Sequence, residues 1–257
     1  MIQRCNFRLA LFVASAIVVI GCGSSHRAAP LPSAPPVDPA TAAEVTGTVK
    51  FEGRPPALKP IDMSAARGCD QVNRKPVVPP VVLTGPGDTL ANVVVFVKSG
   101  LGHYRYPAPQ TPVTLDQKGC MYVPRVVALM TDQLFQVADS DPILHDVRPV
   151  LRNNDPWGLS ELPGKPPVQH RFAQPEFAAL VGCMIHPWMR AYLFVFDQPY
   201  FAVTTQDGNF ALKNMPPGTY TIEAWHEDNQ PIDVTVVLAP KESKSISFTF
   251  HSPSGGG

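Results

Sequence analysis

The stretch VGCMIHPWMRAYLFVF, Val181 to Phe196, holds a cysteine, a histidine and a methionine within seven residues and then continues into an apolar run. Cys183, His186 and Met189 have the spacing C-x2-H-x2-M, which places three soft or borderline metal ligands in one tight loop. The apolar run AYLFVF is typical of a buried strand. We therefore expect the core of a β-protein to anchor this loop.

The rest of the 257-residue chain also favours β-structure. It contains 30 prolines, and sustained helical periodicity is scarce. Residues 44–53 alternate between apolar and polar side chains, which predicts a strand with one buried face, and residues 90–100 predict a second, more buried strand. The dipeptide Asp207–Gly208 predicts a hairpin turn. The expected fold class is all-β.

Charge and motif content exclude several classes of protein. Lys+Arg and Asp+Glu both number 21, so the formal net charge is zero, which argues against a nucleic-acid binder. The sequence contains no nucleophile elbow, P-loop or dinucleotide fingerprint. We do not expect the protein to be an enzyme.

The N-terminal residues have the pattern of an export signal. Arg4 and Arg8 precede an apolar run from Leu9 to Ile20, and VVIGC resembles a bacterial lipobox. The resemblance implies a lipoprotein signal peptide over residues 1–21 and lipidation of Cys22; the alternatives are an ordinary signal peptide or an uncleaved anchor. Residues 22–43 are rich in Pro, Ala and Ser and predict a tether. The expected location is the periplasm or the cell surface, with the outer membrane favoured.

Cysteine counting separates two roles. Cys5 leaves with the signal peptide and Cys22 carries lipid, so three of the five cysteines remain in an oxidising compartment. Since Cys183 has metal-ligand neighbours, we predict a disulfide between Cys69 and Cys120. The alternatives are two buried thiols, or a pairing that involves Cys183.

The ligand triplet is three-quarters of a known type of site. A blue copper site uses a thiolate, two imidazoles and a weak axial thioether. The second imidazole must come from another strand, and SDPILHDV offers His145. Zinc rarely uses thioether sulfur, and one thiolate excludes an iron–sulfur cluster. The alternative is that Cys183 and Met189 are core residues and His186 lies at the surface.

CMIHPWM resembles the ligand loop of the short-loop cupredoxins, those of amicyanin and plastocyanin type. The run YVPRVVALMTDQLFQVADSDPILHDV is similar to the strand, turn, strand and ligand histidine of that family, and the resemblance covers residues 120–200. It implies a Greek-key β-sandwich that holds one type 1 copper ion through four ligands: His145, Cys183, His186 and Met189.

Three further residues are candidates for supporting roles at this site. Asp146 stands where the family usually has an Asn that ties the ligand loops together, and its charge is expected to favour Cu(II) and lower the reduction potential. Trp188 is either a packed residue or part of an apolar docking face. His226 is either a strand-end histidine or an orienting partner of a ligand.

The flanking segments resemble a second family. EVTGTVKFEGRPP, LANVVVFV and FAVTTQDGNFALKNMPPGTYTIEAWHE are similar to parts of the carboxypeptidase regulatory-like domain, a transthyretin-type sandwich. The resemblance implies a discontinuous sandwich over residues 44–111 and 200–251, with a cupredoxin-like domain at 112–199 and a flexible tail at 252–257. One extended sandwich shared by both parts is the alternative.

The sequence therefore predicts a lipid-anchored type 1 copper protein that carries single electrons between redox partners not yet identified. Copper sequestration or delivery is a second hypothesis. A cell-surface interaction or carbohydrate-binding-like module without a redox role is a third, although no exposed aromatic platform supports a sugar site.

Overall fold

The computed structural model describes residues 31–64, 66 and 68–252, and every structural statement below applies to these residues. They form sixteen strands and two short helices, α1 (Cys69–Val72) and the 3-10 helix η1 (Pro86–Asp88). The all-β fold class is confirmed. Within these ranges no helix combines the length and apolar composition needed to span a membrane. The predicted signal peptide, the predicted lipidation site Cys22 and most of the C-terminal tail lie outside the described residues.

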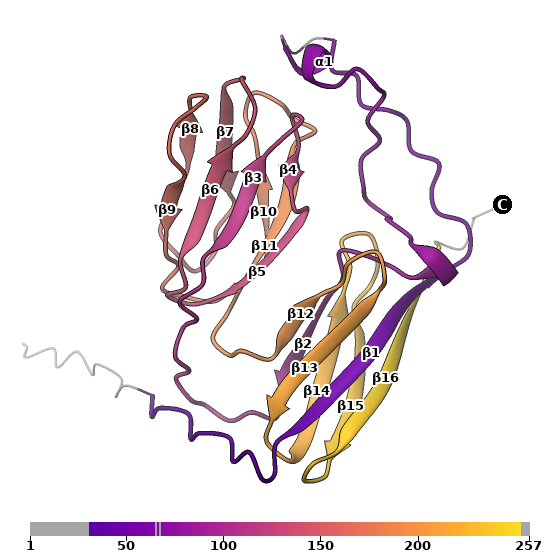
Figure 1. Ribbon diagram of the computed structural model, residues 1–257, viewed down its shortest axis with the longest axis vertical. Coiled ribbons are helices and arrows are strands. Elements are labelled where there is room, and N and C mark those ends of the chain that lie inside the picture. Colours follow the sequence, from indigo (N-terminus) through magenta and orange to yellow (C-terminus); the bar gives the residue numbers. More distant parts are fainter. Residues whose placement is uncertain (1–30, 65, 67, 253–257) are drawn as a thin grey trace, which may run out of the picture. The chain divides into compact units, whose positions relative to one another are not determined.

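The strands form four sheets (Figure 1). Two pairs of these sheets each enclose an apolar core, and a third, smaller buried cluster includes Val94, Phe194 and Trp225. We call the first pair of sheets the outer sandwich, because its strands come from both ends of the chain. One sheet has the order β13-β1-β16 and the other has the order β12-β2-β14-β15. Their bounds are β1 (Ala43–Glu52), β2 (Val94–Ser99), β12 (Phe201–Val203), β13 (Asn209–Met215), β14 (Gly218–Trp225), β15 (Ile232–Leu238) and β16 (Ser243–His251).

The alternation predicted for residues 44–53 is confirmed in β1. Val45, Val49 and Phe51 are buried in the core of the outer sandwich. Gly47 interrupts the series because a Cβ atom there would lie 1.9 Å from the Ile246 carbonyl oxygen and 2.7 Å from the Phe210 ring. The close approach of β1 to its parallel neighbour β16 therefore requires glycine.

The second pair of sheets, the inserted sandwich, lies in sequence between β2 and β12. Its sheets have the orders β5-β11-β10-β7-β8 and β4-β3-β6-β9. Their bounds are β3 (Val113–Gln117), β4 (Tyr122–Val123), β5 (Val126–Met130), β6 (Phe135–Asp139), β7 (His145–Pro149), β8 (Leu159–Glu161), β9 (Val168–His170), β10 (Glu176–Gly182) and β11 (Arg190–Phe196). The apolar run that opened the sequence analysis is β11, which pairs with both β10 and β5.

The hairpin prediction at Asp207–Gly208 is wrong. A turn does form there, with Gly208 at a φ of 67° and its amide donating to the Thr205 carbonyl at 2.9 Å. However, β12 before the turn pairs with β2, whereas β13 after it pairs with β1 in the opposite sheet. The turn therefore carries the chain from one sheet of the outer sandwich to the other.

Residues 61–77, which we call the cover segment, connect β1 to β2 in sequence but pack against the inserted sandwich. Met63 and Cys69 belong to the core of that sandwich, and Ile61, Ala66 and Val77 pack against it. The Ile61 amide donates to the Val77 carbonyl at 2.8 Å, so the segment closes on itself. The cover segment therefore packs with the inserted sandwich, although it lies within residues 44–111, the range predicted for the flanking sandwich.

Candidate metal centre

Strand pairing brings the predicted ligands together from two parts of the chain. His145 is the first residue of β7, and Cys183 directly follows β10. These two strands are antiparallel neighbours, with Val181 opposite Pro149 and Gly182 opposite Arg148. The loop from Cys183 to Met189 then leads into β11. Neighbouring strands thus place His145 beside a loop that is far from it in sequence.

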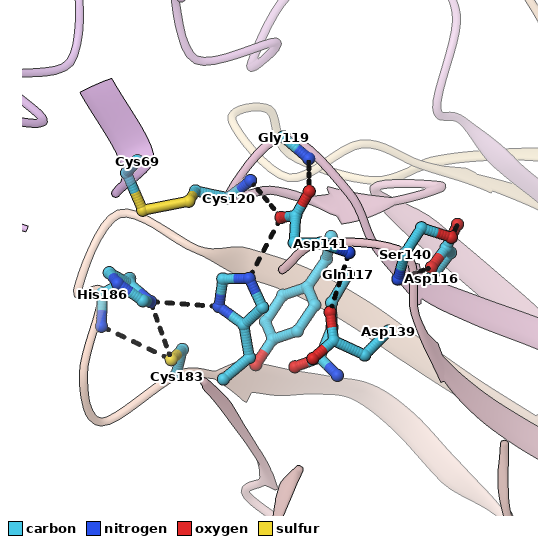
Figure 2. Close-up of polar contacts among 12 residues, drawn as sticks. Cys69, Asp116, Gln117, Gly119, Cys120, Asp139, Ser140, Asp141, Cys183 and His186 are labelled. Carbon is cyan, nitrogen blue, oxygen red and sulfur yellow. Dashed lines mark hydrogen bonds and ion pairs between the residues drawn. A yellow bond between two sulfur atoms is a disulfide. The ribbon is translucent and has the colours of Figure 1, made fainter. Parts of the chain in front are cut away.

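Three potential ligand atoms converge in a buried space. His145 Nδ1 lies 3.1 Å from His186 Nδ1, and Cys183 Sγ lies 3.7 Å from the same His186 atom (Figure 2 labels Cys183 and His186). His145 is 0%, His186 2% and Cys183 7% exposed. The buried imidazoles and thiol therefore face one another and not the solvent.

These separations fit a single metal ion. Two nitrogens bound to one ion at about 2.05 Å lie about 3.1 Å apart when their bonds enclose about 100°. A sulfur bound at about 2.3 Å lies about 3.8 Å from such a nitrogen when the angle is about 120°. One thiolate with two imidazoles is the trigonal donor set of copper electron-transfer sites. The donors present therefore fit copper.

Met189 closes the ligand loop. Its amide donates to the His186 carbonyl at 2.9 Å, and its side chain is fully buried in the core of the inserted sandwich. The loop consequently has little freedom between His186 and the start of β11.

Hydrogen bonds around the thiol favour its ionised form. Burial raises the pKa of Cys183, but a hydrogen bond with His145 and the backbone amides of His186, Ile185 and Asp146 bring that pKa below its usual value. The His186 amide lies 3.4 Å from Sγ. A thiolate is the form that binds metal, so the loop prepares the sulfur for this role.

Asp141 orients His145, a role that the sequence pattern alone did not indicate. Its Oδ2 lies 3.0 Å from His145 Nε2 and accepts the Cys120 amide at 2.7 Å, while its Oδ1 accepts the Gly119 amide at 2.7 Å (Figure 2). With Nε2 engaged, Nδ1 is the nitrogen left for a metal ion. The available signal was the placement of Asp141 four residues before His145, but only the folded turn shows that the carboxylate reaches the ring.

The two histidines differ in their affinity for protons. Burial lowers the pKa of His145, but hydrogen bonds to Asp141 and Cys183 raise it to about 9. Burial and the neighbouring His145 lower the pKa of His186. In the metal-free site, His145 is therefore the positively charged imidazolium at neutral pH. His186 is the neutral imidazole, the form that can bind a metal ion.

A disulfide joins Cys69 to Cys120, and Cys183 is the free cysteine of the described residues. The sulfurs of Cys69 and Cys120 and a ring nitrogen of His186 lie within 4.8 Å of one another. The disulfide therefore fixes the cover segment beside the candidate ligand His186. Asn73 adds a second attachment, since its Nδ2 donates to the Gly119 carbonyl at 2.7 Å.

Trp188 contacts the disulfide-bearing turn. Its indole Nε1 donates to the Cys120 carbonyl at 3.0 Å, and its ring centroid lies 5.4 Å from that of His186. The tryptophan is half-buried and packs against the core. Of the two roles considered from sequence, these contacts describe a packed residue.

The side chains of Asp146 and His226 both make their contacts away from the converging ligand atoms. The Asp146 carboxylate accepts from Ser160 Oγ at 2.9 Å and pairs with Arg148 Nε at 2.9 Å, so it points toward β8 and an exposed arginine. His226 follows β14 in the outer sandwich, where Nδ1 lies 3.0 Å from Asn229 Nδ2 and the ring packs on Phe250. His226 is therefore grouped with the outer sandwich and not with the converging ligands.

Comparisons with solved structures find similarity over part of the chain. No protein-family model matches the sequence, and no curated protein matches it. The chain is similar to the copper-containing nitrite reductase from Thermus scotoductus SA-01, with 20% identity and a TM-score of 0.32 over 35% of this chain and 23% of that chain.

Two structures of amicyanin mutants are also similar. A Cu(I) form has 15% identity and a TM-score of 0.28 over 33% of this chain and 81% of that chain. A reduced Cu(I) form at pH 4 has 15% identity and a TM-score of 0.26 over 34% of this chain and 84% of that chain. These neighbours are cupredoxins, and the similarity extends over about a third of the chain.

Proposed function

We propose that this protein is a type 1 copper protein that carries single electrons between redox partners and does not transform a substrate. The observation that supports this most directly is the convergence of His145 Nδ1, His186 Nδ1 and Cys183 Sγ in a buried space. When bound, copper supplies one-electron exchange between Cu(I) and Cu(II). Met189 is the proposed axial ligand.

The surrounding residues suit this function because they restrict movement. Asp141 fixes the ring of His145, backbone amides surround the Cys183 sulfur, and Trp188 holds the loop to the disulfide-bearing turn. A site that changes little between redox states exchanges electrons with little reorganisation. The low exposure of all three converging donors also keeps water away from the metal.

The test is the visible spectrum of the full chain loaded with Cu(II). We expect an intense thiolate-to-copper band in the wild type, and its loss in Cys183→Ser and His145→Ala. His103→Ala is the matched control, because His103 is an exposed loop histidine and its removal leaves the band unchanged. A colourless wild type that binds only Cu(I) would instead favour sequestration, and absence of copper uptake would favour an interaction or carbohydrate-binding-like module.

We also propose that the protein is exported and lipid-anchored through Cys22, and that it works at the periplasmic or outer surface of a membrane. The lipobox-like VVIGC and the Pro-rich tether support this proposal. Fractionation of cells that express Cys22→Ser tests it: release of the variant into the soluble fraction is expected, and its retention on the membrane would contradict the anchor.

A further inference from the structure

Tyr122 reaches from one sheet of the inserted sandwich to both ligand-bearing strands of the other sheet. It lies in β4, opposite Gln117 of β3. Its hydroxyl lies 2.5 Å from the Asp146 carbonyl oxygen and 3.0 Å from the Gly182 carbonyl oxygen. The side chain is 3% exposed. One phenolic proton is thus shared between acceptors on β7 and β10.

The positions of these acceptors give the contact its significance. Asp146 follows the candidate ligand His145, and Gly182 precedes the candidate ligand Cys183. A hydroxyl held between the two carbonyls therefore fixes the separation of the backbone segments that carry a ligand imidazole and the ligand thiol.

No carboxylate contact of Asp146 within the described structure provides this tie. The family that the ligand loop resembles has an Asn at this position, but the Asp146 side chain points toward Ser160 and Arg148. Near the ligands the strand ends are also joined by main-chain pairing, which extends over Val181 and Gly182, and by hydrogen bonds of the Cys183 sulfur with His145 and the Asp146 amide.

We propose that Tyr122 is the positioning residue that ties the His145 strand to the Cys183 strand, in place of a side chain at position 146. The effect of Tyr122 on bound copper rests on the proposed copper function, whereas its effect on the two strands does not. Burial raises the pKa of Tyr122 above its usual value, so the hydroxyl remains a donor across the neutral range.

The β3–β4 turn, which leads directly into Tyr122, also provides the other supports of the site. Its Gly119 and Cys120 amides donate to Asp141, and Cys120 forms the disulfide to the cover segment. The Cys120 carbonyl accepts from Trp188. One short turn therefore positions both ligand-bearing segments and the cover beside them, with Tyr122 as its direct contact to the two strands.

The test compares Tyr122→Phe with Tyr220→Phe. Tyr220 is a matched control, because it is also 3% exposed and donates to a carbonyl, that of Pro216 at 2.8 Å, but lies in the outer sandwich. Amide hydrogen exchange of the metal-free full chain is measured at residues 145–148 and 181–184. We expect about tenfold faster exchange there in Tyr122→Phe and no change there in Tyr220→Phe. Equal rates in wild type and Tyr122→Phe would overturn the proposal.

A copper readout separates positioning from a general loss of stability. With Cu(II) bound, Tyr122→Phe is expected to change the ratio of the visible bands and to lower copper affinity about tenfold, whereas Tyr220→Phe changes neither. Replacement of Tyr122 by p-aminophenylalanine, which keeps a donor, is expected to restore both exchange and spectrum. If the wild type shows no thiolate-to-copper band while the exchange difference persists, the copper function fails and the tie between strands stands.

Discussion

Asp141 and His145 lie four residues apart in sequence and meet through a 3.0 Å contact between a carboxylate oxygen and Nε2. Both side chains are buried, His145 at 0% and Asp141 at 5% exposure. The same carboxylate accepts two backbone amides from the β3–β4 turn, so its position does not depend on the histidine alone. A candidate ligand is therefore oriented by a group that is itself held in place.

Replacing this carboxylate tests its contribution to copper binding. The Asp141 carboxylate uses both oxygens to bind three partners: the Gly119 amide, the Cys120 amide and His145 Nε2. Asp141→Asn keeps one of these oxygens and replaces the other with an NH2 group, which cannot accept a hydrogen bond. At least one of the three hydrogen bonds is therefore lost. We expect copper affinity to fall by about 10- to 100-fold and the reduction potential to rise, because a less basic imidazole stabilises Cu(II) less. Chelator competition and voltammetry measure these effects. Asp155→Asn, in an exposed loop, is the control, and equal affinities in both variants would contradict the role of Asp141.

The protonation of His145 predicts that copper binding depends on pH. Burial lowers its pKa, but the hydrogen bonds to Asp141 and Cys183 raise it to about 9. Below this value copper must displace a proton from the imidazole, so the apparent affinity should rise by at least about tenfold per pH unit until about pH 9. Chelator competition at several pH values gives the slope, and an indicator dye measures the released proton. An affinity that is constant from pH 6 to pH 8 would refute this prediction.

We expect the Cys69–Cys120 disulfide to make a measurable contribution to the free energy of unfolding. The sequence separation of Cys69 and Cys120 is 51 residues. Closing a loop of that size in the unfolded chain stabilises the fold by about 4 kcal/mol in the chain-entropy treatment. We expect the free energy of unfolding of a Cys69→Ala, Cys120→Ala double variant to fall by about this amount in guanidinium titrations. Reduced wild type is the control and should resemble the variant, whereas an unchanged midpoint would contradict the prediction.

We expect protonation of Glu176 in acid to lower the stability of the fold, whether or not a metal ion is bound. It is 2% exposed, and its carboxylate accepts the amides of Arg152, Asn153 and Asn154. Burial raises its pKa, but these bonds and the Asn154 side chain hold that pKa below the usual value. A depressed pKa stabilises the fold above the unfolded pKa of about 4.3, and this contribution disappears as the pH falls through the folded pKa.

Substitution of Glu176 tests whether its contribution to stability disappears as the pH falls. Glu176→Gln should lower the free energy of unfolding by about 1–3 kcal/mol at pH 7, and the difference from wild type should shrink below pH 4. Thermal unfolding at both pH values measures it. A difference that grows in acid would show that the carboxylate is not the stabilising group.

The sequence predicted the parts of the site that depend on local spacing. Cys183, His186 and Met189 share one loop, and the apolar run after them is β11. His145 was inferred as the missing donor, and the pairing of β7 with β10 brings it to the loop. Such features are encoded within a few residues of one another or in the pattern of a single strand.

The remaining supports depend on contacts between distant segments and could not be predicted in this way. Tyr122 had the pattern of an ordinary strand residue, because its partners Asp146 and Gly182 are defined only by the packing of two sheets. The Pro-rich run near the cover segment gave no indication that the segment would pack beside His186. The Asp207–Gly208 turn was misassigned for the same reason, since local turn chemistry does not specify which sheet receives the next strand.

The pairing of β1 with β16 has a consequence for the order in which the fold can form. A chain that emerges from its N-terminal end presents β1 early, but the strand that pairs with residues 44–52 is made of residues 243–251. All strands of the inserted sandwich emerge before β16, so that sandwich can close while β1 still has an unpaired edge. Until residues 243–251 have been synthesised, β1 thus has an exposed β-edge, which is a site for pairing with other chains.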